Sequence, residues 1–301
     1  MKKGKSRIQI LIAVFVCITV VFIAKSSDEP SDCFTWKVDI NESTFYLAGS
    51  IHSASKENYP LPKAYMKSYK KADKVIFELE DDFKTLEKKI FQYAEKDRLP
   101  EDQNLDQYLS TEAIAKLEQI FDADKLKKYF QYEAWVLNMT ISGVKSKLIG
   151  YDPLLAIDKY FHDLAEKDEK PIIGLDSITT QLLLFDFEVP IDLQVKLIEK
   201  AVDEMEINAN KEAPLMQAYF DNNMELFETE FLKPFDFSKP QMQQMYDMVF
   251  TSRNTSWVER FEKLSTENAG TYFVLVGAGH YFGPHNIREL LEQKGYTIEK
   301  I

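Results

Sequence analysis

Short apolar runs with the composition of β-strands lie near both ends of the chain, and the long middle has the periodicity of helices. Strands are predicted at about 34–40, 43–49, 74–80, 171–177, 271–280 and 295–301, the last as an edge strand. Helical spacing dominates between about 82 and 250, and a long helix is predicted at about 238–265. This order predicts one α/β domain, with a mixed central β-sheet, flanking helices and a largely helical insertion at about 82–250.

The first 25 residues carry a different signal. A basic head, MKKGKSR, precedes an uncharged apolar run from Ile8 to Ala24, close to the length that crosses a bilayer core. Basic residues before this run and the acidic SSDEPSD after it place the rest of the chain outside the cytoplasm. Residues 1–25 are predicted to be a membrane anchor or a signal peptide. Because Lys25 follows Ala24 without a small-x-small cleavage site, an anchor is favoured over cleavage and secretion.

Residues 26–33 are predicted to be a polar linker and residues 34–301 the folded domain. The net charge of the chain is −12, and the domain is more acidic still because residues 1–25 hold five basic residues and no acid. An acidic domain argues against nucleic acid as a partner, since phosphate binding depends on Lys and Arg. Peptides, small molecules and cations remain as ligands. Cys33 is the only cysteine beyond residues 1–25, which excludes an internal disulfide in the exported part of the chain.

Two of the predicted strands run into the same motif, Gly-x-x-His. Gly49 precedes His52, and Gly277 precedes His280. Glycine at a strand end permits a tight turn, and a histidine three residues later lies on the loop where α/β proteins place ligands. One such histidine is more simply a core or loop residue. With only four histidines in the chain, two in matching settings favour a shared site.

Glu78 is the third candidate. In the run KVIFELE it shares a strand face with Ile76, which indicates that both faces are at least partly buried. A buried carboxylate is costly without a partner, so a cation or a general-base role would explain it. The alternative is a half-exposed strand with Glu78 facing water. Two imidazoles and a carboxylate suit Mn, Fe, Co or Zn, and such a metal activates bound water. Glu78 could instead be the base, which would leave only the two histidines as ligands.

Four segments together resemble the TraB/PrgY/GumN family, which is related to the Tiki metalloproteases: TFYLAGSIHSAS, KADKVIFELE, SRNTSW and TYFVLVGAGHYFGPHNIRELLEQKGYTI. The resemblance covers roughly residues 35–301. It implies an α/β fold of the erythromycin-esterase/ChaN-like type and a site that uses His52, Glu78 and His280. It also implies Mn- or Co-dependent proteolysis for the Tiki branch, and restraint of peptide pheromone signalling for the PrgY and TraB branch.

The resemblance adds two further candidates. Arg253 and Asn254 match a family Arg-Asn pair, and Arg253 is predicted to bind a substrate carboxylate or to hold Glu78. An exposed helix arginine is the alternative. Asp176 stands where the family pattern has Gly-Leu-Glu, and its shorter side chain makes it a second-tier metal ligand. Of the other histidines, His162 is predicted to be solvated in a charged helix and His285 to lie at the surface.

These patterns predict an extracytoplasmic, metal-dependent hydrolase that cleaves peptide or peptide-like amide bonds with a metal-activated water. The predicted catalytic residues are His52, Glu78, Arg253 and His280, and the predicted metal ligands are His52, Glu78, Asp176 and His280. Mn or Co is the expected metal, with Zn or Fe as alternatives. The predicted partners are a peptide or protein substrate and, through the N-terminal segment, a membrane. The alternative function is a membrane-tethered protein that binds or sequesters a peptide without turnover. The sequence predicts no oligomeric state.

Overall fold

The computed structural model describes residues 33–301, with gaps at 97, 186–190 and 209–213. The predicted anchor or signal peptide at 1–25 and the predicted linker, apart from its last residue, lie outside the described residues. Within the described part of the chain, no helix is both long and apolar enough to cross a membrane.

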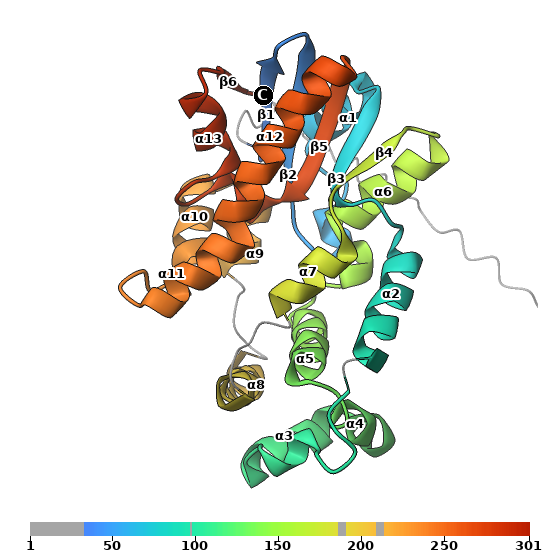
Figure 1. Ribbon diagram of the computed structural model, residues 1–301, viewed down its shortest axis with the longest axis vertical. Coiled ribbons are helices and arrows are strands. Elements are labelled where there is room, and N and C mark those ends of the chain that lie inside the picture. The colour runs from blue at the N-terminus through green and yellow to red at the C-terminus, as the bar shows by residue number, and fades with distance from the viewer. Residues whose placement is uncertain (1–32, 97, 186–190, 209–213) are drawn as a thin grey trace, which may run out of the picture. The chain divides into compact units, whose positions relative to one another are not determined.

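A mixed sheet of six strands organises the fold (Figure 1). The strands are β1 (Thr35–Ile40), β2 (Ser43–Ser50), β3 (Lys74–Leu79), β4 (Ile172–Asp176), β5 (Thr271–Gly277) and β6 (Ile298–Lys300). Their order across the sheet is β4-β3-β5-β2-β1-β6. The first four strands of this order are parallel, whereas β1 is antiparallel to both of its neighbours. Each apolar run that was predicted as a strand contains a strand, although β5 ends at Gly277 and a 3-10 turn at Ala278–Tyr281 follows it. The C-terminal run lies at the edge of the sheet, as predicted.

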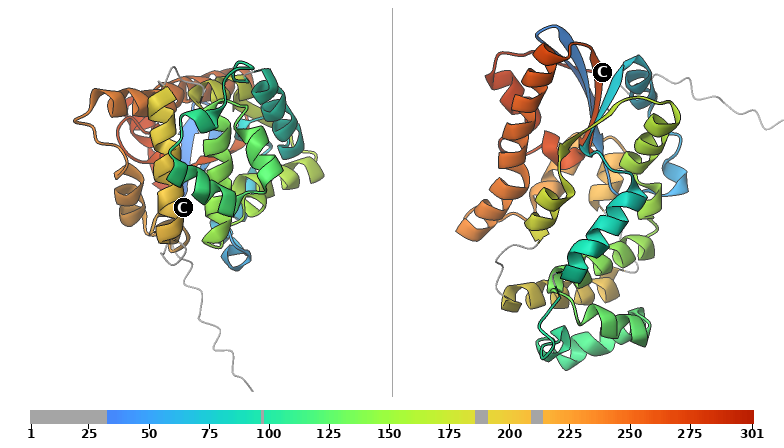
Figure 2. Two further views of the ribbon diagram at one scale, coloured as in Figure 1. Left: turned by 90° about the horizontal axis from the view of Figure 1, so that it is seen from below. Right: turned by 45° about the vertical axis from the view of Figure 1, so that its right-hand side comes forward.

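Helices cover both faces of the sheet, as the apolar composition of its central strands requires. On one face, Tyr69 of α1 (Lys63–Lys71) and Phe161 of α6 (Ile157–Lys167) contact the ring of Phe273 in β5. On the other face, Phe261 of α12 (Ser252–Glu267) contacts Phe45 of β2. The two views of Figure 2 and Figure 1 show α12 and α6 on opposite sides of the strands. In β3 both faces are buried, as predicted.

The remaining helices lie between β3 and β5 in the sequence, apart from α13 (Ile287–Gln293) near the C-terminus. They are α2 (Phe83–Lys96), α3 (Thr111–Ile120), α4 (Ala123–Tyr129), α5 (Ala134–Leu148), α7 (Ile178–Phe185), α8 (Ile191–Asn208), α9 (Pro214–Phe220), α10 (Met224–Leu232) and α11 (Pro240–Tyr246). A π-turn at Asp247–Thr251 joins α11 to α12, so the long helix predicted at 238–265 is present with a widened turn inside it.

A second apolar cluster holds α3, α4, α5 and α8 together. Its buried members include Leu117, Leu126, Leu137 and Ile198, one from each of these helices. Figure 1 and the right-hand view of Figure 2 show these helices beyond the end of the sheet where the parallel strands terminate. The helical segment therefore stands next to the strand ends that carry the predicted site residues.

Candidate functional site

The parallel strands end at one edge of the sheet, and this edge brings the predicted site residues together. The register pairs Ser50 of β2 with Gly277 of β5, and Leu79 of β3 with Asp176 of β4. Both Gly-x-x-His motifs and the two acidic residues therefore meet at the carboxyl ends of neighbouring strands, the usual place for a ligand site in an open α/β sheet.

Glu78 accepts hydrogen bonds on both of its carboxylate oxygens. Its Oε1 accepts the backbone N–H of Gly277 at 2.8 Å, and its Oε2 accepts Arg253 Nη2 at 2.5 Å and Gln181 Nε2 at 3.0 Å. Its side chain is 16% exposed, so it does not face open water. Burial opposes ionisation, but it is outweighed by His280, which is charged only in acid, by the charges of Arg253 and His52 and by the Gly277 N–H, which together lower the pKa of Glu78 to about 2. Glu78 is thus a carboxylate at neutral pH.

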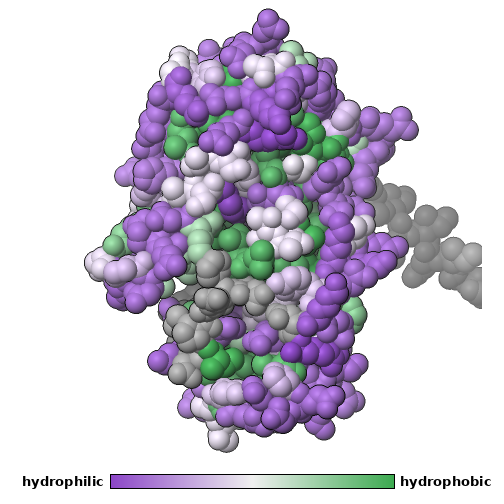
Figure 3. Space-filling view, in the orientation of Figure 1, coloured by the Kyte–Doolittle hydropathy of each residue, from purple (hydrophilic) through white to green (hydrophobic). Residues whose placement is uncertain are grey.

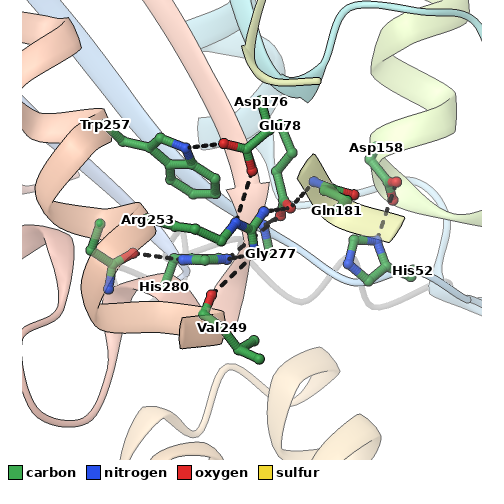
Figure 4. Close-up of polar contacts among 11 residues, drawn as sticks. His52, Glu78, Asp158, Asp176, Gln181, Val249, Arg253, Trp257, Gly277 and His280 are labelled. Atoms are coloured by element: carbon green, nitrogen blue, oxygen red, sulfur yellow. Dashed lines mark hydrogen bonds and ion pairs between the residues drawn. The ribbon is translucent and has the colours of Figure 1, made fainter. Parts of the chain in front are cut away.

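Arg253 is buried at the centre of the site rather than exposed on its helix. Its Nε donates to Asp176 Oδ2 at 2.8 Å, and its guanidinium lies over the Trp257 ring at 4.5 Å (Figure 4). The Trp257 indole N–H donates to the other oxygen of Asp176 at 2.9 Å. Both carboxylate oxygens of Asp176 are therefore engaged, and they fix the plane of the Arg253 guanidinium.

The proton on the His280 ring is placed by Asn254. The Asn254 amide nitrogen donates to the backbone carbonyl of His285 at 3.0 Å, which leaves its Oδ1 to accept from His280 Nδ1 at 2.6 Å. His280 Nε2 then carries a lone pair, 3.2 Å from Arg253 Nη1 and 3.9 Å from Glu78 Oε1. Burial and the charge of Arg253 lower the pKa of His280 to about 3, so the ring is neutral.

His52 stands at the rim, apart from this buried network (Figure 4). Its side chain is 70% exposed, and its Nδ1 lies 3.2 Å from Asp158 Oδ2 at the start of α6. The carboxylate of Asp158 raises the pKa of His52, although water around the exposed ring screens the pair. Two buried tyrosines hold the end of β2 before His52, because the hydroxyls of Tyr65 and Tyr219 both donate to the Gly49 carbonyl, at 2.7 and 2.6 Å.

Gly277 borders the space that the three predicted residues share. A side-chain carbon on Gly277 would lie 3.2 Å from Glu78 Oε1, 3.6 Å from His52 Nε2 and 3.7 Å from His280 Cδ2. The space belongs to a cavity of about 250 Å³. Because all three side chains border this space, it is where a reacting group would be bound.

A comparison with protein families shows to which family the chain belongs. The model of the TraB/PrgY/gumN family matches residues 34–300. The chain belongs to the TraB/PrgY/gumN family. It is 26% identical over 264 residues to a protein called "Uncharacterized protein YbaP" from Escherichia coli strain K12, which spans 86% of this chain and 93% of that relative. It is 22% identical over 270 residues to an uncharacterized protein of Treponema pallidum, with 86% and 80% covered. No solved structure matches.

Membership of the TraB/PrgY/gumN family confirms the resemblance drawn from the motifs. Two residues that hydrogen-bond to the site, Asp158 and Gln181, were not predicted from the sequence. Asp158 lies more than 100 positions from His52, and Gln181 more than 100 positions from Glu78. Neither has a motif of its own, because each is placed by the packing of its helix on the sheet. Asn254, in contrast, was marked by the Arg-Asn pair.

The prediction that His162 is solvated was wrong. This side chain is buried, its Nε2 donates to the Glu80 carbonyl at 3.0 Å, and its ring packs on Phe77 at 5.2 Å. The charged residues around it in the sequence lie on the outer face of α6, whereas Phe161 and His162 face the sheet. His285 is exposed, as predicted.

A divalent metal is implied by the family resemblance, and the donor atoms are of the right kind: two imidazole nitrogens and a carboxylate. Their arrangement, however, does not suit a metal ion. Arg253 Nη1 occupies the lone pair of His280 Nε2, and across the described ranges no group of three or more His, Cys, Asp or Glu side chains is arranged to hold a metal ion. These side chains, as they stand, do not fit a bound metal.

Proposed function

We propose that this protein is a hydrolase that cleaves peptide or peptide-like amide bonds with a water molecule activated by His52. The observation that carries the proposal is the space at Gly277, which His52 Nε2 borders on one side and Glu78, hydrogen-bonded to Arg253, on the other. A base and a buried cation around one open space are the parts that amide hydrolysis needs.

His52 acts as the general base. Asp158 accepts the Nδ1–H, which leaves Nε2 free to take a proton from water and stabilises the imidazolium that forms. The water oxygen bonds to the carbonyl carbon, and its proton moves to His52 Nε2. When the C–N bond breaks, the leaving nitrogen takes this proton, so His52 is neutral again at the end of the cycle.

Arg253 stabilises the negative charge that develops on the carbonyl oxygen. Its guanidinium is held by Glu78 and Asp176, so little reorganisation is needed during the reaction. Glu78 and His280 are positioning residues in this scheme, because each contacts Arg253 and borders the open space.

The alternative to this metal-free mechanism is hydrolysis with a divalent transition metal, for which the family resemblance implies Mn or Co, with Zn or Fe as further choices. His52, Glu78 and His280 would hold it, and a bound cation would have to break the contact between Arg253 and His280. When bound, such a metal lowers the pKa of a coordinated water. A role for Asp176 as a ligand belongs to the same proposal.

The alternative function is peptide binding without turnover. The apolar wall of the cavity favours it, since a pocket lined mainly by hydrophobic side chains can retain a peptide without cleaving it. In that case His52 and His280 would be structural, and peptide would bind tightly and remain intact.

We also propose an extracytoplasmic location, with residues 1–25 as a membrane anchor or, if cleaved, as a secretion signal. The basic head, the apolar run and the acidic stretch after it support this location. A relationship to the Tiki metalloproteases and an erythromycin-esterase/ChaN-like fold are further proposals. The parallel strands with a site at their carboxyl ends are consistent with both.

The test is cleavage of a mixture of synthetic peptides by the full chain purified in detergent, followed by mass spectrometry. We expect new peptide ends with the wild-type protein and none with His52→Ala or Arg253→Ala. His285→Asn is the matched control, because His285 is exposed and asparagine tolerates its positive φ of 55°. Undiminished cleavage by both site variants, with folding verified by circular dichroism, would refute the proposal.

A further inference from the structure

One wall of the cavity at Gly277 is apolar and largely aromatic. It is formed by Leu215, Phe227, Phe231, Val249 and Phe250. Among the polar residues that line the cavity, His52, Glu78, Arg253 and His280 are paired with one another or with neighbouring side chains. The buried hydroxyl of Ser50, which also lines it, has no hydrogen-bond partner among the described residues. Figure 3 shows hydrophobic residues in the middle of one face of the molecule, with hydrophilic residues around its borders.

The wall is built against the second Gly-x-x-His motif. Phe231 of α10 and Phe250 of the π-turn meet edge to face, with ring centroids 5.1 Å apart, and Phe250 lies 5.1 Å from the His280 ring. A side-chain carbon on Gly279 would lie 2.5 Å from Phe231 Cε2. The residue before His280 must therefore be glycine for the Phe231 ring to occupy this position.

We infer that this wall forms a specificity pocket for one apolar side chain of the substrate, next to the amide bond that is cleaved. The inference rests on the proposed hydrolase function and adds a substrate class to it. A cavity of about 250 Å³ lies below the range that holds a drug-sized ligand, roughly 300–1,000 Å³, and suits a single side chain. A charged side chain placed against these phenylalanines would lose its hydration without gaining a partner.

The test uses peptides that differ only in the residue beside the cleaved bond: Leu, Phe, Trp, Ala, Lys or Asp. We expect kcat/KM for Leu and Phe to exceed that for Lys and Asp by at least about tenfold. Phe231→Ala enlarges the pocket and should raise the ratio of Trp to Leu cleavage by about tenfold, whereas Phe231→Leu should keep the apolar preference. Phe91→Ala is the control, because Phe91 is 60% exposed on α2 and lies outside the cavity.

Binding of the same peptides to His52→Ala, measured by titration calorimetry, separates this inference from the proposed function. Apolar preference in both cleavage and binding supports both. Cleavage that ignores the variable residue overturns the pocket and leaves the hydrolase. Apolar preference in binding that shifts from Leu toward Trp in Phe231→Ala, with no cleavage by the wild type, overturns the hydrolase and leaves the pocket. If the wild type does not cleave the peptides and binding shows no apolar preference, both the hydrolase and the pocket are overturned.

Discussion

Arg253 Nη1 donates to His280 Nε2 across 3.2 Å, so an arginine and a neutral histidine share a hydrogen bond at the centre of the site. The contact exists because Asn254 Oδ1 accepts a hydrogen bond from the Nδ1–H of His280, which keeps the ring proton on Nδ1 and leaves a lone pair on Nε2. The lone pair of His280 Nε2 therefore accepts a hydrogen bond from the guanidinium of Arg253. This bond links the second Gly-x-x-His motif to α12, the helix that precedes β5 in the sequence.

This contact predicts weak metal binding. Because Arg253 occupies the His280 lone pair, we expect Mn²⁺ to bind the wild-type protein with no measurable affinity at micromolar concentration, and EDTA to leave activity unchanged. Calorimetric titration with Mn²⁺ and assays after chelation measure both. Tight binding that disappears in both His52→Ala and His280→Ala would contradict the expectation and establish the metal proposal.

The pair of His52 and Asp158 predicts a pH dependence. A general base works only when it is deprotonated, so kcat/KM should rise with pH through the pKa of His52. Asp158 and Glu78 raise the pKa of His52, and Arg253 lowers it. Substitution of Asp158 removes only the contribution of Asp158, because Glu78 and Arg253 are unchanged. In Asp158→Asn the rise should therefore move to lower pH, and kcat should fall by about 10²-fold or more because the ring is no longer oriented. Profiles of kcat/KM that extend from pH 5 to above about 9, the value to which the pKa of His52 is raised, measure the shift, and an unchanged midpoint would argue against this pairing.

Glu78 predicts a loss of stability in acid. Its pKa in the folded protein, about 2, is below its usual value of 4.5, so its contribution is present above that usual value and is lost as the pH falls toward 2. The contribution is on the order of 3 kcal/mol at neutral pH. Glu78→Gln should therefore be less stable than the wild type at pH 7, and the difference should shrink between pH 4.5 and pH 2.

Urea unfolding at a series of pH values measures the difference between the two proteins. Glu57→Gln serves as the control, because Glu57 is exposed at the surface and lies outside the site. A stability difference for Glu78→Gln that stays constant with pH would show that its carboxylate is not held by charge.

Gly277→Ala should remove activity without unfolding the protein. The new methyl group would occupy the space between Glu78 and His52, 3.2 Å from Glu78 Oε1. It would displace the reacting group, and a displacement of about 1 Å costs about 10²-fold in rate. The backbone of Gly277, at φ −49° and ψ 133°, is open to alanine, so the melting temperature should change little.

The matched control for this substitution is Gly143→Ala in α5. A side-chain carbon there would meet nothing within 4 Å, and alanine in a helix is favoured over glycine by roughly 0.5–1 kcal/mol. We expect full activity and slightly higher stability. Full activity in Gly277→Ala would mean that the reaction takes place elsewhere.

The strands could be predicted from the sequence because burial leaves a local pattern. The run of Val75, Ile76 and Phe77 is apolar at consecutive positions, and a strand with both faces covered needs this composition. The same pattern marked Glu78 as an exception within a buried strand. The two Gly-x-x-His motifs were visible because each directly follows such a run.

What the tertiary structure alone decided is how these local pieces meet. No local pattern in the sequence indicates that β5 lies between β2 and β3 in the sheet. This strand order places Gly277 next to Glu78. Nor did any local pattern indicate that Asp158 would pair with His52, or that His162 would be buried. Local patterns report which side chains leave water, because that depends on each residue and its neighbours in sequence. Which buried groups then become partners depends on the packing of distant segments, and only the folded chain determines it.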